Sequence, residues 1–431
     1  MSLTDAIYQS NNSFNYVDQL IINSRANKHN AKETPNEIYD KLKDELQNYK
    51  SSNGEHTNKN KSHNSDKLDI KVQLLLGDNS ISQEWLKMYE IITDCNLIPI
   101  NRKGVFTTFH ICNPSSAFIN CINNYIHTKT QYSSFEWKSQ SVKPKGVHSK
   151  DTTMNGSNKL IQNYREKWDW GVDDTGDITN IENIKYYAKL TKQMNINLMT
   201  SDNGVSMNNP KYAKVAYASY VSILYSLPIN GSMLYKILSP IDIPLIWNLI
   251  YITYTNFKEM YFFKPVQNAQ TRELYIIAKG YIGIEQKILD KLLSFVDIFD
   301  IASDAQANSK TKTQKYTRNY NNADYDNDDN YDNYDNNDNN NDNKHKNLLN
   351  KESYDLFNDT YPEEFVIQVR KICETLSTNY VNSIERIIYY VDNIENLGDE
   401  YKKHIESYMT EKHDDWISEY KPKRLDEKFV L

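Results

Sequence analysis

The sequence predicts an α/β fold with a mainly parallel sheet, low-complexity segments and a helical C-terminal extension. Between about residues 105 and 299, runs rich in β-branched and aromatic residues alternate with stretches of helical apolar spacing, as in mainly parallel sheets. One of these runs, Ile196 to Gly204, ends abruptly in Asp202-Asn203-Gly204. An acidic side chain at a strand tip lies where ligands bind in open α/β sheets, although Asp and Asn are also ordinary turn residues.

Composition limits how much of the 431-residue chain can form a core. Hydrophobic residues make up 39% of it and the mean hydropathy is -0.75, both low for a globular protein of this length. The formal net charge is -7, but residues 319–343 contain eight Asp and no Lys or Arg, and removing these eight charges leaves +1. The acidic balance therefore describes one segment and does not argue against a polyanionic substrate elsewhere.

The chain divides into four predicted regions. Residues 1–67 are dominated by Asn, Ser, Lys and His and should form a mostly disordered lead, interrupted by one short amphipathic helix near residues 35–46. Residues 68–303 hold the α/β domain, and residues 304–352 form an Asn/Asp-rich linker of low complexity. Residues 353–431 should form a helical hairpin packed on the α/β domain, because apolar residues recur there at helical spacing.

Cysteine usage and hydropathy indicate the compartment. The four cysteines show no C-x-x-C pairing and no companion His at zinc spacing, so we expect reduced, mostly buried thiols and no bound metal. The first twenty residues lack an apolar segment of the signal-peptide type. The most apolar stretch, residues 241–254, is too short to span a bilayer. We therefore expect an intracellular protein without a membrane partner.

A helix and a strand precede the first candidate ligand turn. Residues 69–76 have the pattern of a strand or a helix end, and Ser80-x-x-Gln83 resembles a capping box that opens a helix carrying Lys87 among apolar residues. A single Lys on a helix is usually a surface residue whose stem covers apolar neighbours. The β-rich run of residues 105–112 then leads into Asn113-Pro114-Ser115-Ser116-Ala117 and a helix from Phe118. Such a turn lets backbone N–H groups approach a ligand, although it is also an ordinary helix start.

The middle of the α/β domain contains an acidic turn. A strand is expected at residues 134–137, followed by a polar loop to residue 160. The segment from Trp168 then carries Asp173, Asp174 and Asp177 and leads into a helix over residues 180–190, without the spacing of an EF-hand. The Gly-Asp turn before this helix is either a helix cap or a carboxylate that holds a ligand hydroxyl or amine.

The second half of the domain contains one anomalous residue. We expect helices over residues 211–227, 244–257 and 286–299, and strands over 231–238, 259–263 and from Glu273. Lys236 occupies a position in the strand 231–238 where a buried strand would have an apolar side chain. Because a buried ammonium costs on the order of several kcal/mol unless it is paired or loses its charge, a functional role is favoured for Lys236.

Four charged residues follow one another in the order Lys87, Asp202, Lys236 and Glu273, and the small-residue turn lies between the first two. With this order and this turn, the sequence resembles the FtsJ-like ribose 2′-O-methyltransferases, and most closely those of large cytoplasmic DNA viruses. The resemblance covers about residues 80–285. It includes the shared motifs Trp85 to Glu90, Phe118-Ile119, Gly176-Asp177-Ile178-Thr179, Ser201 to Gly204, and Lys264-Pro265. Where the family carries Pro-Gly-Gly-Phe, this chain has Ser115-Ser116-Ala117-Phe118.

The resemblance implies a Rossmann-like sheet, the cofactor S-adenosylmethionine, and a catalytic set of Lys87, Asp202, Lys236 and Glu273. It implies cofactor binding by Asn113, Pro114, Ser115, Ser116, Ala117, Phe118, Asp174 and Asp177. A desolvated Lys236 with a lowered pKa would help to remove or orient the proton of a ribose 2′-hydroxyl, while the two carboxylates would balance the lysines.

The viral likeness further implies an RNA substrate, the capped 5′ end of mRNA, with other capping or transcription proteins as partners and the host cytoplasm and virion as locations. Because no RNA-recognition motif is present, RNA would be held by basic residues in the loops 138–150 and 310–318. The alternative is a catalytically decayed RNA-binding or scaffold subunit that keeps the fold. A dehydrogenase-like nucleotide binder is disfavoured, because no G-x-G-x-x-G follows a predicted strand.

Overall fold

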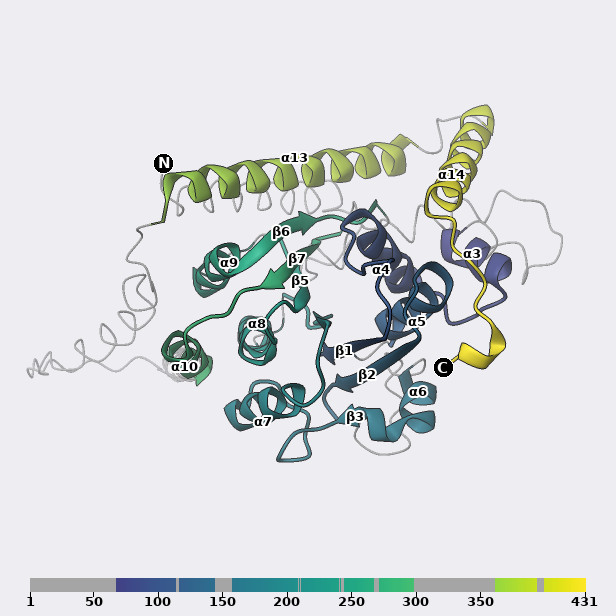
Figure 1. Ribbon diagram of the computed structural model, residues 1–431. Helices are drawn as coiled ribbons and strands as arrows, with labels where there is room; N and C mark the ends of the chain where they lie inside the picture. The colour runs from purple at the N-terminus through teal and green to yellow at the C-terminus, as the bar shows by residue number, and fades with distance from the viewer. Residues whose placement is uncertain are drawn as a thin grey trace, which may run out of the picture.

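One seven-stranded sheet organises the described part of the chain, in the order β3-β2-β1-β4-β5-β7-β6 (Figure 1). The computed structural model describes residues 67–113, 116–143, 157–207, 209, 211–239, 241, 244–266, 271–297, 361–393 and 399–431. The predicted lead up to residue 66, its short helix and the predicted linker 304–352 lie outside these residues. The strands are β1 Val105–Ile111, β2 Ser134–Gln140, β3 Trp168–Asp169, β4 Leu198–Ser201, β5 Ser232–Leu238, β6 Phe257–Phe263 and β7 Glu273–Tyr281.

The sheet is parallel from β3 to β5, and β7 then runs antiparallel to both β5 and β6. This arrangement confirms the predicted α/β fold with a mainly parallel, Rossmann-like sheet. The chain moves outward from β1 to β2 and β3, and then returns to the other side of β1 with β4. The carboxyl ends of β1 and β4 therefore flank the switch point at which open α/β sheets bind their ligands.

Helices cover both faces of the sheet (Figure 1). One core contains residues of α7, α8, α9 and α10, and the other contains residues of α3, α4 and α5. The bounds are α3 Leu68–Leu76, α4 Gln83–Asp94, α5 Ala117–Lys129, α6 Ser157–Asn163, α7 Ile181–Thr191, α8 Tyr212–Ser226, α9 Pro244–Asn256 and α10 Gln286–Ser294. Both faces of the central strands are thus buried, as is usual for parallel sheets with helices on both sides.

Two local predictions need correction, and of the two alternatives for residues 69–76, a strand or a helix end, the helical one is found. Residues 68–76 form the helix α3, and the N-cap of α4 is Ser82, whose hydroxyl accepts the Trp85 N–H at 3.4 Å. The capping role predicted for Ser80 is wrong, because α4 begins at Gln83 and Ser80 therefore lies two residues before the N-cap. The strand β2 extends to Gln140 and pairs with the two-residue strand β3, which the polar composition of this region did not indicate.

Two long helices, α13 Glu363–Asn393 and α14 Asp399–Tyr420, confirm the helical C-terminal extension (Figure 1). They dock on opposite faces of the sheet instead of packing on it as one hairpin. Phe365 and Val369 of α13 join the core that contains α9, whereas Trp416 and Tyr420 of α14 join the core that contains α4. The extension therefore adds apolar contacts to both sides of the α/β domain.

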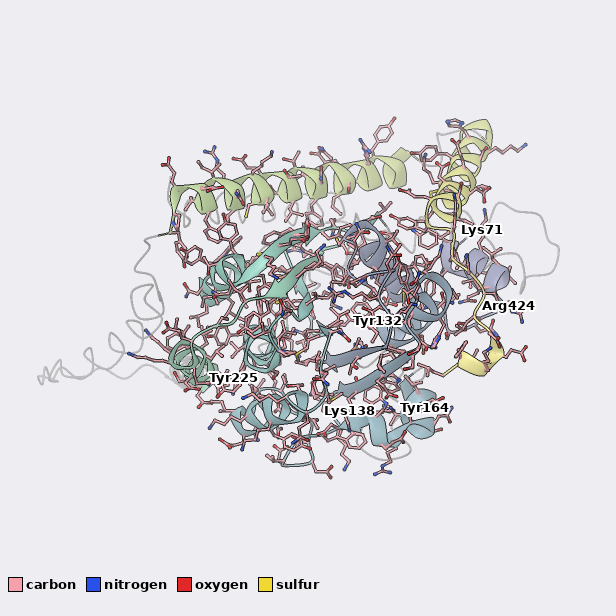
Figure 2. The ribbon with its side chains drawn as sticks, viewed as in Figure 1. Lys71, Tyr132, Lys138, Tyr164, Tyr225 and Arg424 are labelled. Atoms are coloured by element: carbon pink, nitrogen blue, oxygen red, sulfur yellow. The ribbon has the colours of Figure 1, made fainter. Side chains whose placement is uncertain are left out.

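The segment after α14 follows α5 to the end of the chain. Lys129 Nζ donates to the Lys421 carbonyl at 2.7 Å, and Asn123 Nδ2 donates to the Phe429 carbonyl at 2.7 Å. The Phe429 ring stacks on His127 with 3.9 Å between ring centroids. Figure 2 shows Arg424 of this segment beside α3. The C-terminal residues are thus held along the outer side of α5.

Candidate active site

Strand alternation brings two charged side chains to the sheet face that α4 covers. Leu234 of β5 and Tyr275 of β7 belong to the core that contains α4. Lys236 and Glu273 lie two residues from them, and because side chains alternate along a strand, they project from the same face. Since β7 is antiparallel to β5, its first residue, Glu273, pairs with Leu238 at the carboxyl end of β5. The sheet therefore places the two charges at the same edge.

The other two predicted residues reach this edge from β4 and α4. Asp202 follows the last residue of β4 directly, and its N–H donates to the Ile111 carbonyl of β1 at 3.3 Å. Lys87 lies one turn into α4, which packs across the sheet face, and only 3% of the residue is exposed. Lys87 is therefore not a surface residue, unlike most single lysines on helices.

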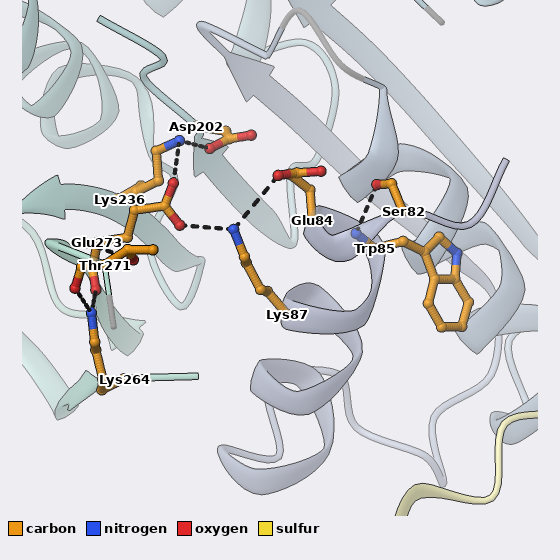
Figure 3. Close-up of polar contacts among 9 residues, drawn as sticks. All are labelled: Ser82, Glu84, Trp85, Lys87, Asp202, Lys236, Lys264, Thr271 and Glu273. Carbon is orange, nitrogen blue, oxygen red and sulfur yellow. Dashed lines mark hydrogen bonds and ion pairs between the residues drawn. The ribbon is translucent and has the colours of Figure 1, made fainter. Parts of the chain in front are cut away.

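The four side chains form one chain of ion pairs (Figure 3). Glu273 joins the two lysines, with Oε2 at 2.8 Å from Lys87 Nζ and Oε1 at 3.7 Å from Lys236 Nζ. Lys236 Nζ also pairs with Asp202 Oδ1. Asp202 and Lys236 are both buried. Residues from four separate elements of the fold are thus brought together into a single cluster.

The charge state of Lys236 differs from the prediction. Burial favours its neutral amine, but the negative charges of Asp202 and Glu273 outweigh burial and raise the pKa of Lys236. The predicted lowered pKa is therefore wrong for the protein without ligands, because two carboxylates lie beside the amine. Burial opposes ionisation of Glu273 as well, yet the charges of Lys236 and Lys87 lower its pKa below the ordinary value. Both shifts favour the charged forms, the Lys236 ammonium and the Glu273 carboxylate.

Lys264, just after β6, is a neighbour of the cluster to which the sequence assigned no role of its own. Its Nζ donates to the carbonyls of Thr271 and, at 2.6 Å, Glu273 (Figure 3). Burial, with a smaller contribution from the charge of Lys87, lowers the pKa of Lys264 to about 7, although Glu273 opposes this. The signal was present in the sequence, because Lys264 ends a β-rich run much as Lys236 interrupts one.

Glu84 is a second residue that the sequence reasoning missed. Its Oε1 lies 3.5 Å from Lys87 Nζ, one turn earlier on α4. The spacing of three residues between them is one at which helical side chains meet, and it was available from the sequence. Lys87 is thus flanked by carboxylates from both α4 and β7.

The predicted cofactor turn lies at the switch point, between β1 and α5. Pro114 and Ser115 are outside the described residues. Asn113 is buried, and its N–H donates to the Gln140 carbonyl of β2 at 3.4 Å. Ser116 has a left-handed backbone with φ of 53° and precedes the first residue of α5, Ala117. Ala117 and Phe118 are buried in the core beneath the turn.

The acidic turn is fixed against the end of β2. Gly176 has φ of 69°, and a Cβ atom there would lie 1.9 Å from the Ser141 carbonyl oxygen, so the turn requires glycine. Asp177 accepts hydrogen bonds from the N–H and hydroxyl of Thr179 at 2.8 and 2.7 Å. Burial, with smaller contributions from the charges of Asp177 and Asp202, raises the pKa of Cys112 just after β1. Asp174 is exposed and pairs with Lys143. Asp177 is exposed as well.

Two buried hydroxyls mark the same edge of the sheet. Among the described residues, Ser141 Oγ, just after β2, and Ser201 Oγ, at the end of β4, have no hydrogen-bond partner. Ser201 is fully buried and Ser141 is 4% exposed. Because buried hydroxyls are normally satisfied, two such groups on either side of β1 fit a polar ligand bound at the carboxyl ends of the strands.

Comparisons with known proteins identify methyltransferases among the homologues of this chain. It is 25% identical over 239 residues to the mouse cap-specific mRNA (nucleoside-2′-O-)-methyltransferase 2, covering 53% of this chain and 31% of that protein. It is 26% identical over 247 residues to a probable methyltransferase of African swine fever virus, covering 53% and 57%. An uncharacterized protein of Acanthamoeba polyphaga mimivirus is 30% identical over 242 residues, covering 54% and 30%.

These homologues confirm the resemblance predicted from the charged residues, to 2′-O-methyltransferases and to proteins of large DNA viruses. The chain spans between 30% and 57% of the length of these three relatives. No family model matches the chain.

Membrane-spanning helices and metal clusters are both absent from the described residues. None of the helices there combines the length and apolar character needed to cross a membrane. No group of three or more His, Cys, Asp or Glu side chains in this part of the chain lies together as a metal ion would require. The four cysteines are free, and three of them are buried.

Proposed function

We propose that the protein is an S-adenosylmethionine-dependent RNA ribose 2′-O-methyltransferase that acts on the mRNA cap to form cap 1. The observation that carries the proposal is the buried cluster of Lys87, Asp202, Lys236 and Glu273 at the carboxyl edge of the sheet. Buried ions without a ligand to serve are costly, so a cluster of this kind is typical of a functional site.

The chemistry of the cluster suits a poor nucleophile. A ribose 2′-hydroxyl placed beside Lys236 would receive a hydrogen bond from its ammonium group, and the positive charges of Lys236 and Lys87 would stabilise negative charge that develops on the oxygen. Asp202 and Glu273 hold both amines in place through the ion pairs already described. Because the pKa of Lys236 is raised, its ammonium would orient the bound hydroxyl, and the hydroxyl proton would pass to solvent as the O–CH3 bond forms and the S–CH3 bond breaks.

The cofactor would supply an electrophilic methyl group on a sulfonium. We assign its binding to the turn of residues 113–118 and to Asp177 or Asp174. The hydroxyls of Ser141 and Ser201 fit this assignment, because both are buried without a hydrogen-bond partner at the same edge of the sheet. The backbone N–H groups at the start of α5 add donors next to Ser116.

The RNA substrate is proposed from the homologues, one of which is named as specific for mRNA caps. From the same likeness we also propose other capping or transcription proteins as partners. If the chain is viral, it would act in the cytoplasm of a host cell and in the virion. The scaffold alternative is less favoured, because a non-catalytic subunit has no need to gather three lysines around one glutamate.

The test combines a binding measurement with a turnover measurement. Titration with S-adenosylmethionine by calorimetry should show micromolar binding, and the protein should transfer methyl groups to a short capped RNA. Lys236→Ala should abolish transfer and leave cofactor binding largely intact, because the amine contacts the hydroxyl and not the cofactor turn.

A matched control is Lys279→Ala. Lys279 also lies on the sheet and pairs with a carboxylate, Glu259, at 2.7 Å, but it belongs to the far end of β7. This variant should keep its turnover. Retained turnover in Lys236→Ala would contradict the assigned chemistry, and absence of cofactor binding by the unmodified protein would favour the scaffold.

A further inference from the structure

Glu90 is a buried carboxylate of α4 that the proposed chemistry does not use. The residue is fully buried and lies three residues after Lys87. Its Oε2 accepts the Val266 N–H at 2.9 Å, and its Oε1 accepts the indole N–H of Trp416 at 2.8 Å. One side chain therefore joins three parts of the fold: α4, the segment that follows β6, and the C-terminal helix α14.

Two of these parts carry amines of the candidate site. Val266 lies two residues after Lys264, whose Nζ donates to the Glu273 carbonyl. Lys87, one turn before Glu90, contacts the Glu273 carboxylate at 2.8 Å. The distance between Lys87 and Lys264 thus depends on how α4 is placed against the segment after β6, and Glu90 makes a direct polar link between these two elements.

The C-terminal extension supports this arrangement from two sides. Trp416 packs against Tyr89 of α4 with 6.2 Å between ring centroids, and it is 5% exposed. At the other end of the connection between β6 and β7, the Arg272 guanidinium lies 5.6 Å from the ring of Tyr380 on α13. Arg272 directly precedes Glu273. Both ends of the connection that leads from Lys264 to Glu273 are therefore linked to a helix of the extension.

We infer that Trp416 and Glu90 are positioning residues for methyl transfer: the indole N–H fixes the Glu90 carboxylate, which holds the segment after β6 against α4 so that Lys87 and Lys264 both face Glu273. This rests on the proposed function. A carboxylate with two short hydrogen bonds is held in one orientation, and small displacements of reacting groups lower the rate strongly. The C-terminal extension thereby helps to position the residues of the site.

The test compares two tail variants that each remove one hydrogen bond between α14 and α4. Trp416→Phe keeps an aromatic ring but removes the N–H that binds Glu90. Tyr420→Phe removes a hydrogen bond of the same kind, from the tyrosine hydroxyl to Asp94 Oδ2 at 2.9 Å, between the same two helices. Asp94 is the last residue of α4, remote from Lys87, so this variant is the matched control.

Two quantities are measured in each variant. The first is turnover on capped RNA together with the dissociation constant for S-adenosylmethionine. The second, which needs no activity, is hydrogen exchange at the Val266 amide. Trp416→Phe should lower kcat by about tenfold at unchanged cofactor affinity and speed Val266 exchange by roughly tenfold, and Tyr420→Phe should change neither.

Unchanged kcat and exchange in Trp416→Phe, or equal losses in both variants, would overturn the inference. If Trp416→Phe does not fold, Glu90→Gln tests the same link, because the two N–H groups bind different carboxylate oxygens and the amide replaces one of these acceptors with an NH2 donor. If the unmodified protein transfers no methyl groups, the proposed function fails, and the exchange measurement still decides whether Trp416 holds the segment after β6.

Discussion

Glu273→Gln and Lys87→Met, made singly and together, should reveal a strong coupling between the two side chains. Glu273 is the only acidic residue that contacts both Lys87 and Lys236 among the described pairs. Its replacement by glutamine keeps the shape of the side chain and removes the charge. We therefore expect the single variants to destabilise the protein, and the double variant to cost clearly less than their sum.

The expected coupling follows from the distances. At an effective dielectric constant of about 20, the attraction across 2.8 Å between Lys87 and Glu273 is about 6 kcal/mol. Desolvation of the two ions removes much of this gain, since the lysine side chain is 4% exposed and the glutamate side chain 22%. A coupling free energy of about 2–3 kcal/mol is therefore expected, at the upper end of values for residues in contact.

The assay is urea denaturation of the four proteins. A surface cycle provides the reference: Arg370 and Glu374 of α13 form an equally short pair, 2.6 Å, but their side chains are 45% and 52% exposed. This pair should couple by about 0.5 kcal/mol or less. If the Lys87–Glu273 coupling does not exceed that of the surface pair, burial does not strengthen the cluster and the electrostatic argument for the site is refuted.

Two further predictions concern the neighbours of the cluster. Lys264 has a folded-state pKa of about 7 against 10.5 for the free side chain, so between these values the unfolded chain binds the extra proton and stability rises with pH. The stability of the unmodified protein relative to Lys264→Met should therefore increase by about 1 kcal/mol per pH unit from about pH 7.5 to 9.5, and a flat difference would show that the amine is not desolvated. Ser116→Gly should be more stable than Ser116→Ala by about 1 kcal/mol in urea denaturation, because both lose the hydroxyl but only Gly adopts φ of 53° without strain; equal stabilities would contradict the strain.

The sequence was sufficient for the sheet and for the residues that interrupt its patterns. Buried strands such as β5 are almost wholly apolar, so Lys236 stood out against its neighbours and strand alternation fixed the face on which it lies. The end of β4 was equally clear, since Asp202-Asn203-Gly204 stops an apolar run. These features depend on local composition, which a single sequence carries in full.

Features that depend on contacts between distant segments could not be predicted from the sequence. The direction of the Lys236 pKa shift is set by Asp202 and Glu273, and Glu273 is adjacent only because β7 is antiparallel to β5. Glu90 lies in a stretch with the apolar spacing of a helix. Nothing in that stretch indicated that Trp416, more than three hundred residues later, would bind it. The extent of β2 was likewise decided by its pairing with β3 and not by its polar residues.

The replaced glycines of the cofactor turn bear on whether the turn still has the shape that a ligand needs. If Ser116 could not adopt a left-handed backbone, the turn would have a different shape. Ser116 has φ of 53°, a conformation that favours glycine. The substitution therefore costs stability at Ser116, the residue that precedes α5. On this argument the loss of glycine does not by itself favour a decayed scaffold, and the comparison of Ser116→Gly with Ser116→Ala measures how much strain the turn holds.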